Sequence, residues 1–147
     1  MATSEETKWD LEFVRCKVPQ LIPRSLIESV KGLTFSPDDF YSYQVRNLDN
    51  PNNFIFYLIN PIRRVHGFLW AERNVLDSSL FVNTFSVSKE YWGKGQGIPH
   101  VIEFLRELCQ KVQIKRTYWM TTNEKFFVKK GFRRSKNVLM EYNFEKV

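Results

Sequence analysis

The sequence predicts a single mixed α/β domain over residues 1–147, with a largely antiparallel central sheet, one parallel strand pair and about four flanking helices. Three observations predict this class. Three segments rich in β-branched and aromatic residues, 53–60, 65–72 and 79–87, are separated only by turn-like segments, as in an antiparallel meander. A glycine-rich segment, YWGKGQG, then opens an apolar segment with helical spacing over residues 98–112. A further strand-like segment follows, and a strand–helix–strand unit makes its two strands parallel.

The chain before the meander predicts one strand and two helices. Residues 9–14 alternate roughly as a strand, and residues 24–32 form a short helix that ends at Gly32. Residues 36–45 begin with a clear helix start. Ser36 can cap the first turn, and the proline and two aspartates that follow it suit the first helical positions.

The last part of the chain predicts two strands around a short helix. Residues 115–122 follow the long apolar helix as a strand. Residues 123–130 form a short helix that ends at Gly131, and residues 138–144 close the chain as a strand.

The composition fits one globular domain, because 43% of the residues are apolar and 26% are charged. No apolar segment approaches the ~20 residues that span a bilayer, and the polar first residues do not form a secretory signal, so we expect a cytoplasmic protein without a membrane segment.

Cys16 and Cys109 lie far apart and the chain has only two histidines, which excludes a structural zinc site and predicts no metal. The net charge of +6 fits an anionic ligand, an acidic protein or nucleic acid.

The segment YWGKGQG holds three of the six glycines of the chain, Gly93, Gly95 and Gly97. Glycines at a helix start let the backbone approach a ligand closely, and the unpaired N–H groups there suit a phosphate. Lys94 adds a positive charge and Gln96 a neutral donor. The spacing differs from a P-loop, and from a dinucleotide fingerprint, which needs GxGxxG after a first strand and an acidic residue ~20 positions later.

The segments WGKGQG and FFVKKGF, in this order and within this succession of elements, resemble the two motifs of the acyl-CoA binding core of the GNAT superfamily of N-acetyltransferases. The first family motif, [Q/R]xxGx[G/A], lies between the fourth strand and the third helix. The second is an aromatic segment similar to FYEKLGF. The resemblance covers residues 54–144, and the preceding residues match in the order of elements.

The resemblance implies a GNAT-like acyl-CoA N-acyltransferase fold and an enzyme that uses acetyl-CoA as co-substrate. An acceptor amine would attack the thioester directly, and a backbone N–H near Val87 would stabilise the developing oxyanion. The pantetheine arm would bind along the fourth strand, and the diphosphate would bind at the glycine loop. The implied cofactor-binding residues are Phe85, Ser86, Val87, Gly93, Lys94, Gly95, Gln96, Gly97, Ile98, Asn123 and Phe127.

The sequence departs from the family pattern at three positions. Trp92 stands at the polar head of the first motif, which leaves the backbone cradle in place. Phe127 stands where the family commonly has a tyrosine that protonates the leaving thiolate. The pantetheine-binding asparagine of the family lies further ahead of that tyrosine than Asn123 lies ahead of Phe127, so Asn123 is either a cofactor ligand or a helix cap.

The catalytic acid and base remain open between a few side chains. Tyr118, Tyr91 or solvent could protonate the thiolate in place of the missing tyrosine. Glu72, at the end of its strand, and Glu90, beside the loop, are the candidate bases. We expect Glu72 and Tyr118 as the catalytic pair.

Two other functions compete with an acetyltransferase that acts on a small-molecule, peptide or protein amine. One is a CoA-binding module with little or no catalysis, which the phenylalanine in the second motif favours. The other is a nucleic-acid-binding protein, for which charge is the only support. Basic residues around the last helix could serve the 3′-phosphate of CoA, an acidic partner or only the solvent: Lys125, Lys129, Lys130, Arg133 and Arg134.

Overall fold

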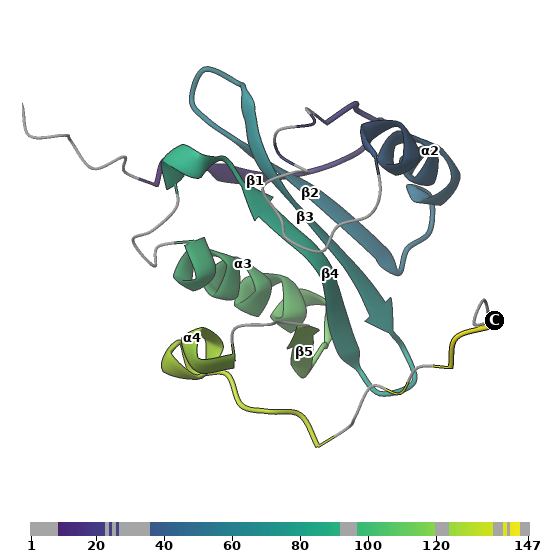
Figure 1. Ribbon diagram of the computed structural model, residues 1–147, viewed down its shortest axis with the longest axis vertical. Coiled ribbons are helices and arrows are strands. Elements are labelled where there is room, and N and C mark those ends of the chain that lie inside the picture. The colour runs from purple at the N-terminus through teal and green to yellow at the C-terminus, as the bar shows by residue number, and fades with distance from the viewer. Residues whose placement is uncertain are drawn as a thin grey trace, which may run out of the picture.

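A five-stranded sheet with the strand order β1-β2-β3-β4-β5 forms the centre of the molecule (Figure 1). The computed structural model describes residues 9–22, 24, 26, 36–91, 97–119, 124–136, 140 and 142–144. The described elements are β1 (Glu12–Arg15), α2 (Pro37–Asn47), β2 (Asn53–Ile59), β3 (Val65–Asn74), β4 (Ser79–Val87), the 3-10 turn η1 (Lys89–Tyr91), α3 (Gly97–Val112), β5 (Arg116–Trp119) and α4 (Glu124–Lys129).

The sheet has the predicted topology. Strands β1 to β4 pair antiparallel in chain order, and β4 pairs with β5 in parallel. The predicted fold class is thereby confirmed. Of the helix expected over residues 24–32, the structure describes Arg24 and Leu26, both helical, and the rest of that segment lies outside the described residues.

The start of α2 is fixed by a capping box, as its sequence predicts. The Ser36 side chain accepts a hydrogen bond from the backbone N–H of Asp39 at 3.1 Å, and the Asp39 carboxylate accepts one from the Ser36 N–H at 3.1 Å. The Ser36 backbone N–H, and after it the Ser36 side chain, favour the charged carboxylate and lower the pKa of Asp39. Pro37 occupies the first helical position, where its missing N–H has no consequence.

Each face of the sheet packs against a different helical layer, so two apolar cores result. Figure 1 shows α2 on one face of the sheet and α3 on the other. The α2 face buries Cys16, Ile22, Leu26, Phe40, Ile55, Tyr57 and Phe68. The α3 face buries Phe54, Phe56, Leu69, Ala71, Leu80, Val82, Val101, Leu105 and Ile114.

Helix α4 ends at Gly131, as predicted, in a Schellman motif. Gly131 has a φ of 96°. Its N–H donates to the Val128 carbonyl at 3.1 Å, and the Phe132 N–H donates to the Phe127 carbonyl at 3.1 Å. The rings of Phe127 and Phe132 pack edge to face with their centroids 4.9 Å apart, which supplies the apolar contact typical of this motif.

The closing strand predicted over residues 138–144 is not formed by the part of it that the structure describes. Met140 and residues 142–144 belong to no strand. The side chains of Met140, Tyr142 and Phe144 are 84%, 80% and 90% exposed. A strand gains its stability from cross-strand pairs, and these described residues have no strand partner, so a local β pattern was insufficient here.

In the described part of the chain, no helix combines the length and the apolar character that crossing a bilayer requires.

Candidate functional site

Strand β4 carries a β-bulge in its middle, at Asn83. Trp70 of β3 lies opposite Thr84 and Ala71 lies opposite Val82, so Asn83 is the extra residue of β4. The parallel pairing between β4 and β5 runs from Ser79 to Val82 and ends directly before this bulge. A bulge bends its strand and increases the local twist, so β4 changes direction where its described pairing with β5 ends, at Val82 and Trp119.

Beyond the bulge, residues 84–87 of β4 pair with β3 on one side and with no described strand on the other. The Ser88 N–H donates to the His66 carbonyl of β3 at 2.7 Å. Backbone groups alternate in direction along a strand, so the N–H and C=O groups of Ser86 point toward β3 and those of Phe85 and Val87 point away from it. The backbone groups of Phe85 and Val87 therefore point to the side of β4 on which β5 lies.

The predicted cofactor residues of β4 differ in how their side chains are used. The hydroxyl of Ser86 is buried and donates to the Leu26 carbonyl at 2.5 Å, which ties β4 to the segment on its α2 face. Phe85 belongs to the core on the α3 face, and Val87 belongs to a smaller core around Leu11. Only backbone atoms of Phe85 and Val87 point to the β5 side of β4.

Helix α3 begins at Gly97, and it follows β4 after the single turn η1. Residues 92–96 lie outside the described residues, so the predicted loop positions Gly93, Lys94, Gly95 and Gln96 stay predictions, as does Asn123. Gly97 and Ile98 lie in the first turn of α3, beside the end of β4. A Cβ on Gly97 would lie 3.6 Å from the Phe85 ring, an ordinary contact, so the described neighbours do not require glycine there.

An aromatic cluster connects β4, β5 and α4. The ring centroids of Phe85 and Trp119 lie 6.4 Å apart, those of Trp119 and Phe127 lie 5.8 Å apart, and Phe132 lies against both Trp119 and Phe127. The predicted cofactor residue Phe127 is thus a packing residue that holds α4 against the edge strand. Its role toward a cofactor stays a prediction.

The two predicted catalytic residues lie in one row across the sheet, with β4 between them. Glu72 lies opposite Phe81, and Phe81 lies opposite Tyr118. The Glu72 Oε1 accepts hydrogen bonds from Asn83 Nδ2 at 3.0 Å and from the Tyr43 hydroxyl at 3.3 Å. The Tyr118 hydroxyl accepts a bond from Arg116 at 3.3 Å. The carboxylate of Glu72 is therefore one hydrogen bond away from Asn83, the bulged residue of β4.

Sequence analysis missed Asn83 and Tyr43, the two residues that hold Glu72. The only local signal was an asparagine within the otherwise apolar and small-residue segment SLFVNTFSV. Burial and the charge of Glu72 raise the pKa of Tyr43, so this hydroxyl keeps its proton and remains a donor at neutral pH.

The alternative acid and base candidates are engaged elsewhere. The Tyr91 hydroxyl donates to the Asp10 carboxylate at 2.7 Å, and burial together with Asp10 raises the pKa of Tyr91. The Glu90 carboxylate lies 2.9 Å from His66 Nδ1. Both contacts tie η1 to neighbouring segments, which favours a structural use of Tyr91 and Glu90.

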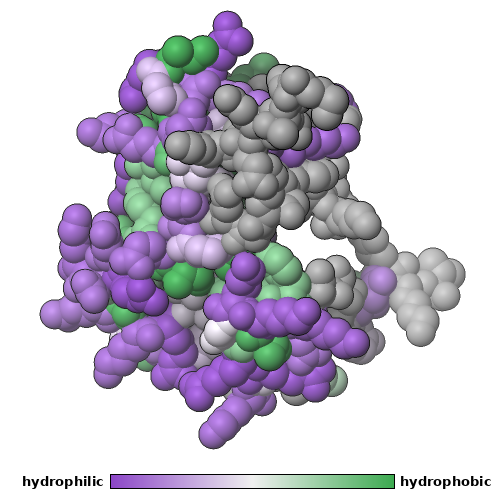
Figure 2. All heavy atoms as spheres, turned by 90° about the vertical axis from the view of Figure 1, so that its left-hand side faces the viewer, coloured by the Kyte–Doolittle hydropathy of each residue, from purple (hydrophilic) through white to green (hydrophobic). Residues whose placement is uncertain are grey.

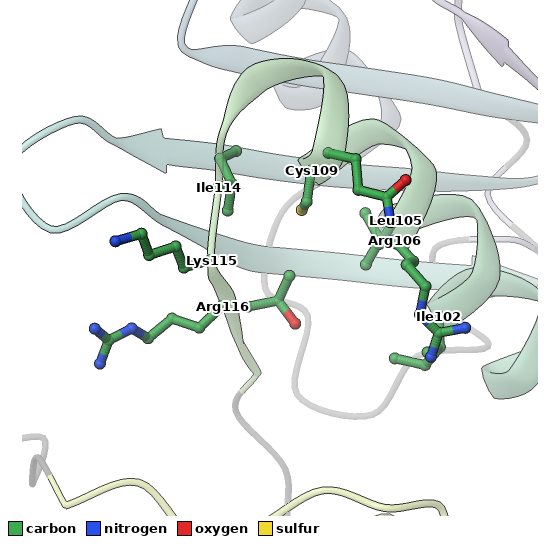
Figure 3. Close-up of a pocket in the computed structure, with 9 residues that line it drawn as sticks. Ile102, Leu105, Arg106, Cys109, Ile114, Lys115 and Arg116 are labelled. Atoms are coloured by element: carbon green, nitrogen blue, oxygen red, sulfur yellow. The ribbon is translucent and has the colours of Figure 1, made fainter.

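A groove of about 260 Å³ lies between α3 and β5 (Figure 3). It is lined by Ile102, Leu105, Arg106, Cys109, Gln110, Ile114, Lys115, Arg116 and Thr117. Figure 3 shows that the charged ends of Lys115 and Arg116 extend away from that of Arg106, so the three cations do not converge on one ligand. The groove also borders the start of β5, where β4 and β5 are paired, rather than the residues of β4 beyond the bulge.

The basic residues around α4 are mostly solvent-exposed. Figure 2 shows the face that carries α3 and α4, and at the level of α4 its side chains are predominantly hydrophilic. Lys125, Lys129 and Arg133 are exposed, and Arg134 pairs with Glu124 at 3.3 Å. Among the described residues, no group of three or more histidine, cysteine or acidic side chains is placed to hold a metal ion.

Comparison with known proteins yields structural matches only. No family model matches the chain, and no curated protein matches it in sequence. A possible acetyltransferase of Clostridium difficile 630 superposes with a TM-score of 0.70 and 14% identity, over 92% of this chain and 99% of that one. A chimera of the spermidine N-acetyltransferase SpeG from Vibrio cholerae and hSSAT gives 0.68 and 14% identity, over 92% and 88% of the two chains. A transcriptional regulator of Bacillus halodurans C-125 gives 0.66 and 9% identity, over 91% and 99%.

At such low identities, similarity of structure establishes the fold and not the reaction, since one fold hosts many functions. The matches extend over nearly the whole chain, and they include proteins named acetyltransferases. With its five-stranded sheet, its single parallel strand pair and its helices on both faces, the chain has the fold of the GNAT acetyltransferases.

Proposed function

We propose that the protein is an acetyl-CoA-dependent N-acetyltransferase that transfers the acetyl group to a primary amine. The observation that carries this proposal is the direction of the Phe85 backbone groups, which point to the β5 side of β4 beyond its bulge and have no described strand partner. An extended chain with amide groups can bind such an edge as an added strand. The pantetheine arm of CoA contains two amides and fits this requirement.

The cofactor would enter from the start of α3. The glycine loop that precedes this helix, with Gly93, Gly95 and Gly97, would bind the diphosphate through its backbone N–H groups. Lys94 would add a positive charge and Gln96 a neutral donor. Because α3 begins beside the end of β4, a diphosphate there and an arm along the β5 side of β4 form one continuous path toward the bulge at Asn83.

The reaction would occur where this path ends. The neutral amine attacks the thioester carbonyl, a C–N bond forms, and the C–S bond breaks as the thiolate leaves. The backbone N–H of Val87 points to the β5 side of β4 and would donate to the developing oxyanion. Glu72 would accept the amine proton, and Tyr118, across β4, would protonate the thiolate.

The test is acetyl transfer itself. Purified protein is incubated with acetyl-CoA and separate panels of amines, release of free CoA thiol is followed, and the acetylated product is identified by mass. We expect acceptor-dependent release from at least one amine class, and a loss of about 100-fold or more in kcat for Glu72→Gln, the size typical of a lost general base. Thermal stabilisation by CoA with no transfer to any amine would contradict the proposal.

Thermal stabilisation by CoA without acetyl transfer is the result expected from the competing function, a CoA-binding module with little or no catalysis. Phe127 favours it, because in the sequence motif it matches the position of the family's acid but has no hydroxyl, and its ring packs against Trp119 and Phe132. A transfer rate that is unaffected by Phe127→Tyr would argue against this alternative. The expected cytoplasmic location stays a prediction under either function.

A further inference from the structure

The excess positive charge of the chain lies between residues 103 and 136, a stretch that includes the end of α3, β5 and α4. This stretch contains ten lysines and arginines and three glutamates, so its net charge of +7 exceeds the +6 of the whole chain. Two of the three glutamates are paired within it, Glu103 with Arg106 at 2.6 Å and Glu124 with Arg134 at 3.3 Å. Such a concentration of cations attracts anionic partners to this part of the molecule.

The groove between α3 and β5 lies within this basic stretch and has an apolar floor (Figure 3). Leu105 and Ile114 are buried there, and Ile102 and Cys109 are half-buried beside them. The volume of about 260 Å³ is smaller than the range of about 300–1,000 Å³ typical of small-molecule pockets. The groove therefore suits a single large aliphatic side chain better than a whole cofactor.

The rim of the groove is polar, exposed and cationic. It consists of Arg106, Gln110, Lys115 and Arg116. Among the described residues, Lys115 and Arg116 form no ion pair with a carboxylate, and the Arg116 guanidinium donates to the Tyr118 hydroxyl at 3.3 Å. Figure 3 shows that the charged ends of Lys115 and Arg116 extend in a different direction from that of Arg106. Separate carboxylates along an extended chain can reach such cations, whereas one compact anion cannot.

The chemistry of the floor favours a protein segment over a nucleic acid. Single-stranded nucleic acids are bound largely by stacking of their bases on aromatic side chains. None of the described residues that line the groove is aromatic. An aliphatic floor instead gains from burying a leucine or isoleucine side chain. A cationic rim around an aliphatic floor is thus complementary to an acidic segment that carries one aliphatic residue.

We propose that the groove between α3 and β5 is a docking site for an extended acidic segment of another protein. One aliphatic side chain of that segment lies on the floor, and its carboxylates meet Lys115, Arg116 and Arg106 at the rim. This inference goes beyond the proposed acetyl transfer and does not depend on it. The groove borders the start of β5, where Arg116 is paired with Ser79 of β4, and not the backbone of Phe85 beyond the bulge.

The experiment measures binding to the full chain by fluorescence anisotropy at physiological salt. Three labelled probes are compared: the peptide EEELEEE, the peptide EEESEEE, and a ten-nucleotide oligouridylate. We expect EEELEEE to bind about tenfold or more tightly than EEESEEE, the difference expected for burial of one leucine side chain, and the oligouridylate not to bind. Bound EEELEEE should also slow the alkylation of Cys109 by iodoacetamide, because this thiol lines the groove.

Variants test the assignment of the residues. Lys115→Glu combined with Arg116→Glu should weaken binding of EEELEEE about fivefold or more, through the loss of two exposed charge pairs. The matched control is Lys125→Glu combined with Lys129→Glu, which reverses two exposed charges of the same stretch outside the groove and should leave binding nearly unchanged. Cys109→Met fills the groove and should reduce the preference for EEELEEE over EEESEEE. Unfolding in urea verifies that each variant is folded.

Three results would overturn the docking site. Equal binding of the two peptides, or equal loss of binding in the two double variants, would leave only a diffuse attraction of anions. Tighter binding of the oligouridylate that depends on Lys115 and Arg116 would assign the groove to nucleic acid. Self-association of the protein that is lost in the Lys115 and Arg116 double variant, without peptide binding, would assign it to a second copy of the chain. Acetyl transfer is measured separately by thiol release, so these results leave the proposed function untouched.

Discussion

Replacing Gln44 by leucine is expected to lower the free energy of unfolding by about 2 kcal/mol, because a buried amide then ceases to join three segments. Gln44 lies on α2 and is 0% exposed. Its Oε1 accepts from the Tyr57 hydroxyl at 2.7 Å and from the Gln20 N–H at 3.0 Å, and the Cys16 thiol lies at 3.5 Å. Its Nε2 donates to the Gln20 carbonyl at 3.0 Å.

The magnitude follows from which groups lose their partners. The thiol of Cys16 keeps the Val18 carbonyl at 3.2 Å, and the Tyr57 hydroxyl keeps only a long contact of 3.5 Å to the Gln20 carbonyl. Leaving a buried hydroxyl poorly bonded costs about 1–3 kcal/mol. The Gln20 N–H belongs to an exposed residue, so water can replace its lost acceptor at little cost.

Urea unfolding followed by tryptophan fluorescence measures this loss. The matched control is Tyr57→Phe, which removes one hydroxyl but leaves the Gln44 amide bonded to Gln20, and we expect it to cost about 1 kcal/mol or less. An unfolding free energy for Gln44→Leu equal to that of the wild type, or a smaller loss than for Tyr57→Phe, at an unchanged m-value, would refute the reasoning.

Three further predictions concern single positions. Gly67→Ala should destabilise the protein by about 1–3 kcal/mol in urea unfolding, because an added Cβ would lie closer to the Ser86 carbonyl oxygen than the sum of their van der Waals radii. Side-chain motion cannot relieve this clash with the backbone, and an unchanged midpoint would contradict the prediction. Gln113→Gly should stabilise it by up to about 1 kcal/mol, since Gln113 ends α3 with a left-handed φ of 59°, and a loss of stability would count against the strain. Burial against Trp9 lowers the pKa of His100 in the folded protein below its ordinary value near 6.5. Neutral His100 therefore stabilises the fold above pH 6.5. This stability is lost as the pH falls from 6.5 through the lower folded pKa. NMR titration of the His100 ring should give a value below 6.5, and a value at or above it would reject this assignment.

The sequence allowed prediction of those features that depend on local patterns. The strands β2, β3 and β4 were found because apolar and β-branched residues concentrate between turn residues. The start of α2 was found because a serine, a proline and two aspartates act within one turn. Gly131 ended α4 as expected, since a left-handed residue at that position is a local requirement.

The candidate site depends on contacts between segments far apart in the chain, and these were not predicted. The bulge at Asn83 is a property of two paired strands, so it has no signature in β4 alone. The hydrogen bond from Tyr43 to Glu72 joins α2 to β3 across 29 positions. The sequence also predicted Phe127 as a cofactor contact. The structure shows that the Phe127 ring packs against Trp119, a contact that depends on how α4 lies against β5.

Along β4, the backbone amides of neighbouring residues point alternately to the two sides of the strand. The N–H of Ser86 faces β3, while those of Phe85 and Val87 point to the β5 side. Because the N–H of Phe85 has no described strand partner, deuterium from solvent should replace its hydrogen sooner than that of Ser86. A molecule that pairs with this edge of β4 would slow that replacement at position 85 and leave position 86 unaltered, so two neighbouring residues report occupancy and its reference.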